Sequence, residues 1–404
     1  MPQGFFSKKE TESTSAIGGK IHSCASCGLY KDCTTPKMKP HGDFKKGIMC
    51  IGESPEHVDD VRGVPWQGNG GSLLRRALSR FGIDLERDCV SLNAVNCMIN
   101  GRRKKPENRE IDHCRSVLVW KAIEKYKPKV IIPFGASALK SLLAHRWSKG
   151  LAISKWRGRQ IPDQQINSWV CPTFRPGYLL HEDKPKDMMR IWINDLKRAI
   201  KKTKQPFPHY NPPEIEYVKD LRFLQDYSGG LSAFDYETTG IKPHARGHRI
   251  VTCAIADSEN HVWTFPVLSK KQIYFLRKWL ADPKIPKVAQ NMKFEHHWSK
   301  EIFNVTVRGW EWDTMLASHI LDNRTGTTGL KFQTYVQFGI LGYEEEVDFY
   351  LKSSGNEQGS NTKNEIQRLL KTSSGRKKVL KYNALDSIYE YRLAVKQMRQ
   401  LNWK

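Results

Sequence analysis

Four acidic residues and one tyrosine in the second half of the chain have the types and spacing of a site for divalent metal ions. Asp235 and Glu237 are two residues apart, so on a strand they point to the same face and reach the same pair of metal ions. Glu295 lies farther along, and Tyr382 and Asp386 are four residues apart, which places them on one helix face. Carboxylate oxygens suit Mg²⁺ or Mn²⁺. The pattern predicts a site in which these side chains hold such ions.

These residues belong to longer motifs: FDYETTG from residue 234, QNMKFE from 290, WDTML from 312 and YNALD from 382. In this order the motifs resemble the proofreading 3′→5′ exonuclease domain of family A DNA polymerases, over about residues 214–404. The resemblance implies an RNase H-like fold, two divalent ions held by Asp235, Glu237 and Asp386, and a water oriented by Tyr382. Glu295 takes the place of an aspartate of the family as a metal-binding or water-bridging anion. Its extra methylene predicts reduced or retuned activity rather than loss.

Four of the nine cysteines have the spacing of a metal centre. Cys24 and Cys27 form a C-x2-C pair, expected in a loop before the first strand, and Cys97 and Cys114 follow farther along. Thiolates at such spacing suit zinc or an iron–sulfur cluster, and the spacing alone leaves both open. An odd number of cysteines without a signal peptide argues for a reducing compartment rather than a disulfide framework.

Further motifs surround these cysteines: GESPE from residue 52, GVPWQGNGGSLL from 63, NAVNC from 93, FGASAL from 134 and RPGYLL from 175. Together with the cysteine positions, they resemble the uracil-DNA glycosylase superfamily, and its family-four iron–sulfur members in particular, over about residues 22–202. The resemblance implies a [4Fe–4S] cluster, with zinc as the alternative, held by Cys24, Cys27, Cys97 and Cys114. Cys33 and Cys50 are expected to stand outside this centre.

The same resemblance implies a pocket for a base turned out of the duplex. Trp66 takes the place of the stacking aromatic residue, Asn93 that of the amide that reads the base edge, and Glu53 that of the acid of the first motif. Arg175 stands where the family has a histidine that donates to the developing anion, and arginine is larger and permanently charged. Glu56 adds a negative charge nearby. Two alternatives stay open: excision of uracil or a modified pyrimidine, and DNA binding without turnover.

The chain is strongly basic, with 66 lysines and arginines against 42 acidic residues and a net charge of +24, most of it in the first half. A field of this sign attracts polyanions, so DNA is the expected partner. A solvated basic surface is the alternative. Predicted contacts to the DNA backbone are Arg102, Arg103, Lys104, Lys105, Arg157 and Arg159.

Short apolar strands alternate with helical patterns in the first half, which predicts an α/β domain with a parallel sheet. Three successive strands followed by helices predict a mixed sheet in the second half. A seam rich in proline, KKTKQPFPHYNPP, separates the halves, and a mobile loop is expected over 353–364. The expected order is a flexible N-terminus over 1–21, a glycosylase-like domain over 22–202, a linker over 203–213 and an exonuclease domain over 214–404.

The sequence has no apolar run long enough to span a membrane and no secretory signal in its first twenty residues, so a cytoplasmic protein is expected. Family A polymerases continue for several hundred residues beyond the exonuclease domain, and the resemblance therefore implies that synthesis is absent or belongs to a separate polymerase. The leading hypothesis is a 3′→5′ DNA exonuclease with a glycosylase-like DNA-binding domain. The alternatives are uracil excision as the main activity and a non-catalytic replisome scaffold.

Overall fold

The computed structural model describes residues 21–99, 105–147, 150–181, 186–267, 269–352 and 363–403. Arg102, Arg103 and Lys104 lie outside the described residues, as do positions 353–362 of the expected loop and nearly all of the expected flexible N-terminus. The chain divides into two compact units, residues 1–209 with 336–339 and residues 210–335 with 340–404. Each unit is described by itself.

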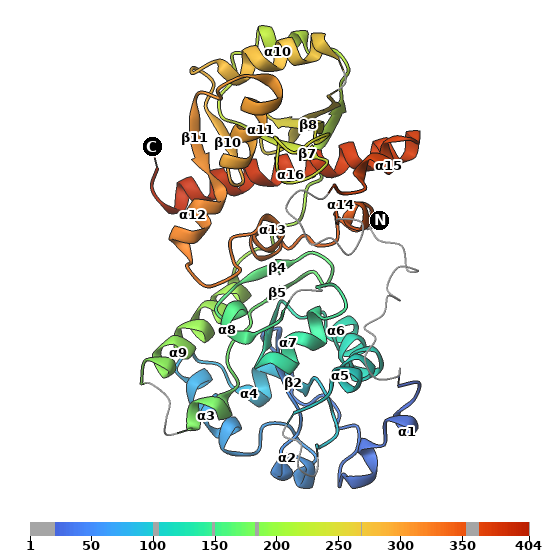
Figure 1. Cartoon of the computed structure of the whole chain (residues 1–404). Helices are drawn as coiled ribbons and strands as arrows, with labels where there is room; N and C mark the ends of the chain where they lie inside the picture. Colours follow the sequence, from blue (N-terminus) through green and yellow to red (C-terminus); the bar gives the residue numbers. More distant parts are fainter. Residues whose placement is uncertain are drawn as a thin grey trace. The chain divides into compact units, whose positions relative to one another are not determined.

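The first unit is built on a five-stranded sheet with the spatial order β2-β1-β3-β5-β4 (Figure 1). Its strands are β1 (Ile48–Gly52), β2 (Cys89–Asn93), β3 (Val130–Pro133), β4 (Ile161–Asp163) and β5 (Ser168–Val170). All neighbours pair in parallel except β4, which lies antiparallel to β5 at the edge. The strands are buried throughout, as in a parallel sheet covered on both faces. The predicted parallel sheet is confirmed, with one antiparallel edge strand.

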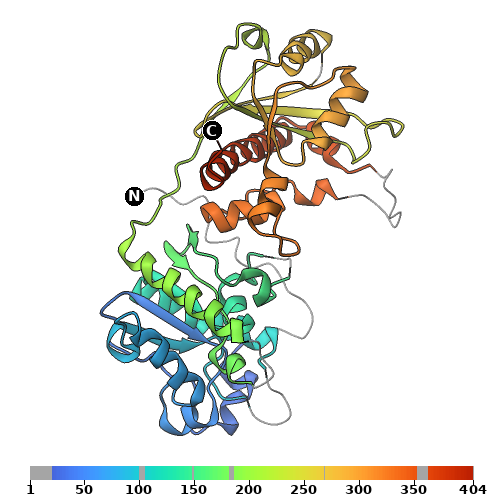
Figure 2. The ribbon, with the colours of Figure 1, turned by 90° about the vertical axis from the view of Figure 1, so that its left-hand side faces the viewer.

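The helices of the first unit are α1 (Cys24–Cys27), α2 (His57–Arg62), α3 (Asn69–Ser79), α4 (Leu85–Asp88), α5 (Asn108–Cys114), α6 (Trp120–Tyr126), α7 (Ala136–Leu143), α8 (Ile153–Trp156) and α9 (Lys186–Lys201). Figure 2 shows α9 running across the strands. Trp192 and Leu196 of α9 join Leu74 and Leu78 of α3 in one apolar cluster against the sheet. The apolar face of each helix therefore fixes the layer that supports the strand ends.

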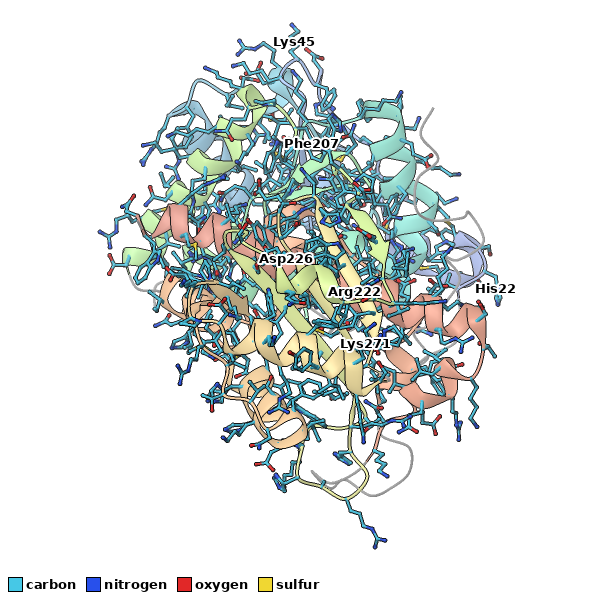
Figure 3. The ribbon with its side chains drawn as sticks, turned by 90° about the horizontal axis from the view of Figure 1, so that it is seen from above. His22, Lys45, Phe207, Arg222, Asp226 and Lys271 are labelled. Carbon is cyan, nitrogen blue, oxygen red and sulfur yellow. The ribbon has the colours of Figure 1, made fainter. Side chains whose placement is uncertain are left out.

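The proline-rich seam contributes side chains to both units. Phe207, labelled in Figure 3, meets the ring of Trp169 edge-on with a centroid separation of 5.9 Å. Tyr210 accepts a hydrogen bond of 3.1 Å from the hydroxyl of Tyr389. The boundary between the two units falls between His209 and Tyr210, inside the stretch over which a linker was expected.

The second unit contains a six-stranded mixed sheet with the order β11-β10-β7-β8-β9-β6. Its strands are β6 (Glu214–Tyr217), β7 (Ser232–Thr238), β8 (Ile250–Ala256), β9 (His261–Pro266), β10 (Lys287–Ala289) and β11 (Trp310–Asp313). β7, β8 and β9 form an antiparallel meander, and β10 and β11 continue the sheet in parallel on the other side of β7. This order confirms the predicted mixed sheet of an RNase H-like fold.

The helices after β9 are α10 (Lys270–Ala281), α11 (Lys293–Phe303), α12 (Thr314–Leu321), α13 (Leu330–Phe338), α14 (Asp348–Leu351), α15 (Ile366–Leu370) and α16 (Ser373–Gln400). Figure 1 shows α16 crossing the sheet beside β7 and β8. The hydroxyl of Ser387 on α16 donates to the main-chain oxygen of Ala233 on β7 at 3.0 Å. On the other face, Trp279 of α10 and Trp298 of α11 pack in the core with Phe234 of β7.

The surface near the start of α10 is charged. Arg222, Asp226 and Lys271, labelled in Figure 3, are exposed there. Beneath them, Leu221 and Leu224 are buried against the core residue Phe275. Among the described residues, no helix has both the length and the apolar character needed to cross a membrane.

Candidate functional site

Three carboxylates come together in the second unit. Asp235 and Glu237 extend from the same face of β7, and Asp386 reaches them from α16. One ligand oxygen of each residue lies within 4.8 Å of those of the other two. Within the described part of the chain, they form the one group of three or more His, Cys, Asp or Glu side chains that converges this closely. Hard oxygen donors at this spacing fit a divalent cation such as Mg²⁺ or Mn²⁺.

Hydrogen bonds hold two of these carboxylates in place. The Asn383 amide donates from Nδ2 to Asp235 Oδ2 at 2.6 Å and to the Asp235 main-chain oxygen at 3.2 Å. The Tyr343 hydroxyl donates to Asp386 Oδ1 at 2.6 Å, and Lys331 forms an ion pair with the same oxygen. The sequence pattern did not predict these three partners. Only Asn383 carries a local signal, since it lies three residues before Asp386 on α16.

Tyr382 lies beside the carboxylates. Its ring is inclined by 30° to that of Tyr343, with a centroid separation of 6.1 Å. Burial raises the pKa of Tyr382, and the negative charges of Asp386 and Glu237 raise it further. The phenol therefore keeps its proton at neutral pH and is available to hydrogen-bond a water molecule near Asp386.

Two more buried glutamates lie next to this group. Glu295, in the first turn of α11, is 2% exposed, and Glu390, one turn after Asp386 on α16, is 1% exposed. In each, Oε2 is buried without a hydrogen-bond partner. Glu295 was predicted, but it lies outside the group of three that converges most closely. Glu390 was not predicted, although its spacing from Asp386 places both on one helix face.

Negative charge at the site is only partly offset. Burial raises the pKa of Asp235, Glu237, Glu295 and Glu390, and neighbouring carboxylates raise these pKa values further. Lys331 acts in the opposite direction on Asp235 and Glu237. Because buried like charges repel, a bound cation would lower the free energy of the ionised site.

In the first unit, the four predicted cysteine ligands lie near one another. Cys24 and Cys27 are on α1, Cys97 follows β2 and Cys114 ends α5. Burial, together with the charges of the other three thiols, raises the pKa of Cys114 to about 12. Among the described residues, no three sulfur atoms lie within 4.8 Å of one another. The arrangement of these thiols leaves zinc and an iron–sulfur cluster both open.

The C-x2-C pair was expected in a loop, and this expectation was wrong. Cys24–Cys27 is a short helix because Ser23 and Ser26 form a reciprocal capping box at its start. A fifth thiol, Cys33, interacts with Cys97 and also donates to the main-chain oxygen of Leu29 at 3.1 Å. The cluster of cysteine side chains therefore includes Cys33 in addition to the four predicted ligands.

A cavity of about 200 Å³ opens at the carboxyl ends of the parallel strands in the first unit. Its walls include residues that follow β1, β2, β3 and β5, as expected for a ligand site of an open α/β sheet. All four predicted pocket residues line it: Glu53, Trp66, Asn93 and Arg175. The structure therefore brings the predicted base-binding residues into one cavity.

The wall of this cavity contains unsatisfied donors. Trp66 Nε1 and Asn93 Nδ2 are buried without hydrogen-bond partners, and a ligand that offers acceptors would satisfy such donors. The ring of Trp66 meets that of Phe134 edge-on at a centroid separation of 5.3 Å. Gly52 permits the close approach of the amide, because a Cβ at this position would lie 2.2 Å from Asn93 Oδ1.

The Arg175 and Glu53 side chains face each other across the cavity. Arg175 Nη1 lies 3.4 Å from Glu53 Oε2, and the backbone N–H of Ser137, at the start of α7, donates to Glu53 Oε1 at 3.1 Å. Burial raises the pKa of Glu56, as does the charge of Asp59, while Arg175 lowers it. The arginine that replaces the expected histidine is therefore placed between two acids of the first motif.

Two known families match the two halves of the chain. The model of the uracil DNA glycosylase superfamily matches residues 39–197. The type-4 uracil-DNA glycosylase of Thermotoga maritima is 32% identical over 184 residues, which cover 45% of this chain and 91% of that protein. The chain belongs to the uracil-DNA glycosylase superfamily. A second type-4 enzyme, from Archaeoglobus fulgidus, is 34% identical over 182 residues, covering 44% of this chain and 87% of the relative.

The 3′-5′ exonuclease model matches residues 217–402, so the chain also carries an exonuclease domain of the family A polymerase type. The DNA polymerase of Bacillus phage SP01 is 24% identical over 377 residues, which cover 82% of this chain and 38% of that polymerase. Among solved structures, Brucella melitensis NrnC with bound Mg²⁺ is 20% identical, covers 46% of this chain and 80% of its own, and has a TM-score of 0.31. Both resemblances inferred from the motifs are confirmed, as is the prediction of an enzyme of the 3′→5′ exonuclease type.

The basic residues predicted to contact DNA differ in their surroundings. In the glycosylase domain, Lys105 is exposed and Arg159 is partly buried. Arg157 Nε forms an ion pair with Asp195 Oδ2 at 3.2 Å. Arg157 therefore already has an acidic partner, and its part in DNA binding stays a prediction.

Proposed function

We propose that this chain removes nucleotides from DNA 3′ ends by a reaction that depends on two divalent cations. The observation that carries this proposal is the convergence of Asp235, Glu237 and Asp386, whose ligand oxygens lie within 4.8 Å of one another. The exonuclease family match over residues 217–402 supports the reaction type. The net charge of +24 supports a polyanionic substrate.

Each residue has a proposed part. Asp235, Glu237 and Asp386 hold the cations, and Glu295 contributes a further carboxylate from α11. Bound Mg²⁺ or Mn²⁺ would supply the charge that activates water and stabilises the phosphate as it is attacked. The protonated hydroxyl of Tyr382 orients the attacking water, and Asn383 keeps Asp235 in position through the 2.6 Å hydrogen bond.

The test is digestion of a single strand labelled at its 5′ end in the presence of Mg²⁺. The wild type should shorten the strand stepwise from the 3′ end, and chelation should stop the reaction. Asp235→Asn keeps the size of the side chain but removes its charge, and should lower the rate at least about 100-fold. Glu301→Gln, an exposed position on α11, is the matched control and should be unaffected. Continued digestion by the Asp235→Asn variant would reject the proposal.

Excision of uracil is a second candidate, favoured by the cavity lined by Trp66, Asn93, Glu53 and Arg175. In this reading, Trp66 stacks on the extruded base and the Asn93 amide pairs with its edge. Uracil-containing DNA should acquire alkali-sensitive sites that are lost in Asn93→Ala. Arg175→His should increase the yield of these sites, because it removes the cation beside Glu53 and supplies a neutral donor. No cleavage with either protein at enzyme excess would leave the domain as a DNA-binding module.

For the cysteine cluster of the first unit we propose a [4Fe–4S] cluster on Cys24, Cys27, Cys97 and Cys114, with zinc as the alternative. The similarity to type-4 uracil-DNA glycosylases supports the cluster. Metal analysis of protein purified without oxygen should give about four iron atoms per chain and little zinc. A separate polymerase acting with this chain stays a prediction, tested by co-purification.

A further inference from the structure

Lys331 is a positive charge inside the carboxylate group of the exonuclease domain. It lies in the first turn of α13, and its ammonium pairs with Asp386 Oδ1. Lys331 Nζ also lies over two aromatic rings, 3.9 Å from the centroid of Tyr343 and 4.2 Å from that of Tyr382. Its side chain is 22% exposed. The ammonium is therefore largely removed from water and held by an acid and two aromatic faces.

Asp386 has a second hydrogen-bond partner, so its orientation does not depend on Lys331 alone. Tyr343 donates to the same oxygen, Oδ1, at 2.6 Å. This bond would still orient the Asp386 carboxylate after the ammonium left. Lys331 is therefore not the sole support of Asp386, and the charge it brings is its distinctive contribution.

The positive charge of Lys331 affects all three carboxylates of the site. Lys331 forms an ion pair with Asp386, and its charge also lowers the pKa of Asp235 and Glu237. Three carboxylates within 4.8 Å of one another repel strongly when no cation lies among them. A lysine on a flexible four-carbon stem can neutralise such a group and can also swing away from it.

We propose that Lys331 is a built-in counter-cation that holds the carboxylates together without metal and leaves Asp386 when a divalent cation binds. This inference rests on the proposed metal-dependent function. It makes Lys331 a positioning residue that competes with the metal, and so sets the metal concentration at which the site fills. Removing Lys331 should have opposite effects on two properties: the metal-free protein becomes less stable, and the site binds metal more tightly.

The experiment uses the full chain and Mn²⁺ as the probe. Thermal unfolding of the Lys331→Met variant in chelator should show a midpoint several degrees below that of the wild type. Calorimetric titration should show Mn²⁺ bound roughly tenfold more tightly by the variant. Lys331→Arg should restore both values towards those of the wild type, and Lys300→Met, an exposed position on α11, should change neither.

The outcomes separate the two proposals. If Lys331 had a merely structural role, Lys331→Met would lower both the stability and the Mn²⁺ affinity. That result, or an unchanged Mn²⁺ affinity, would overturn the counter-cation role and leave the exonuclease proposal intact. Absence of Mn²⁺ binding by the wild type would overturn both. Because the readouts are binding and stability, they do not depend on the activity of the metal-loaded enzyme.

Discussion

The side-chain amide of Asn383 joins the long helix α16 to the central strand β7 through its 2.6 Å hydrogen bond to Asp235 Oδ2. The same Nδ2 group also donates to the main-chain oxygen of Asp235 at 3.2 Å. Asn383 is fully buried, so no water molecule can easily replace it. The carboxylate nearest the centre of the sheet is thus oriented from the helix that also carries Asp386.

Replacing Asn383 by alanine should lower exonuclease activity by about 10- to 100-fold, because partners that orient metal ligands typically contribute this much. The change should appear mainly in kcat and in Mn²⁺ affinity, since Asn383 is buried and its amide holds Asp235. Single-turnover digestion and calorimetry of the full chain measure both. Asn364→Ala, which removes a different amide bonded to β7 at the oxygen of Thr238, is the matched control. Equal losses in both variants would show that Asn383 acts through general stability.

The pH dependence of stability should report the buried acids. Burial raises the pKa of Asp235, and Asp386 raises it further. An acid whose pKa rises on folding binds its proton more tightly when folded, so its contribution to stability is present at low pH and is lost as pH rises through the folded pKa. In chelator, the unfolding midpoint of the wild type should therefore fall from about pH 5 upwards.

Asp235→Asn provides the control for this prediction, because it removes one of the titrating acids. Its unfolding midpoint should fall less steeply with pH than that of the wild type. Mn²⁺ binding by the wild type should release protons, so its affinity should increase with pH. Parallel pH profiles of the two proteins would contradict the assignment of the raised pKa to this site.

Local geometry explains which parts of the site were predictable. The two-residue spacing of Asp235 and Glu237 fixes a shared face on any strand, and the four-residue spacing of Tyr382 and Asp386 does the same on a helix. The pairing of strand with helix followed from the family motifs. The role of Lys331 could not be predicted, because its contact with Asp386 depends on how α13 packs. No local periodicity of the sequence encodes that packing.

The two sheets also show which elements could be predicted from local sequence patterns and which could not. Parallel β1, β2 and β3 were predictable because apolar runs alternate with helical patterns. The antiparallel edge strand β4, Ile161–Asp163, has only three residues and leaves almost no pattern. The helix at Cys24–Cys27 was missed for the opposite reason, since the Ser23 and Ser26 capping signal was present in the sequence but was outweighed by the shortness of the segment.

Glu390 on α16 supports a further prediction about stability. Its Oε2 atom is buried without a partner, and burial together with Asp235 and Glu295 raises its pKa. Glu390→Gln keeps the shape and removes the titrating proton, so the variant should become more stable than the wild type as pH rises, by about 1 kcal/mol or more at pH 9. Thermal unfolding in chelator at pH 6 and pH 9 measures the difference. A variant that is less stable at both values would show that the carboxylate itself is needed.

The cysteines of the first unit allow a prediction about which of them bind the proposed metal cluster. Cys33 interacts with Cys97 but is not one of the four cysteine positions that match the family motifs. Its thiol donates to the main-chain oxygen of Leu29 at 3.1 Å, so Cys33 has a partner other than a metal centre. Cys33→Ser should therefore keep the iron content of the wild type, whereas Cys114→Ser should lose most of it. If the two variants lost iron equally, Cys33 would have to be counted among the ligands.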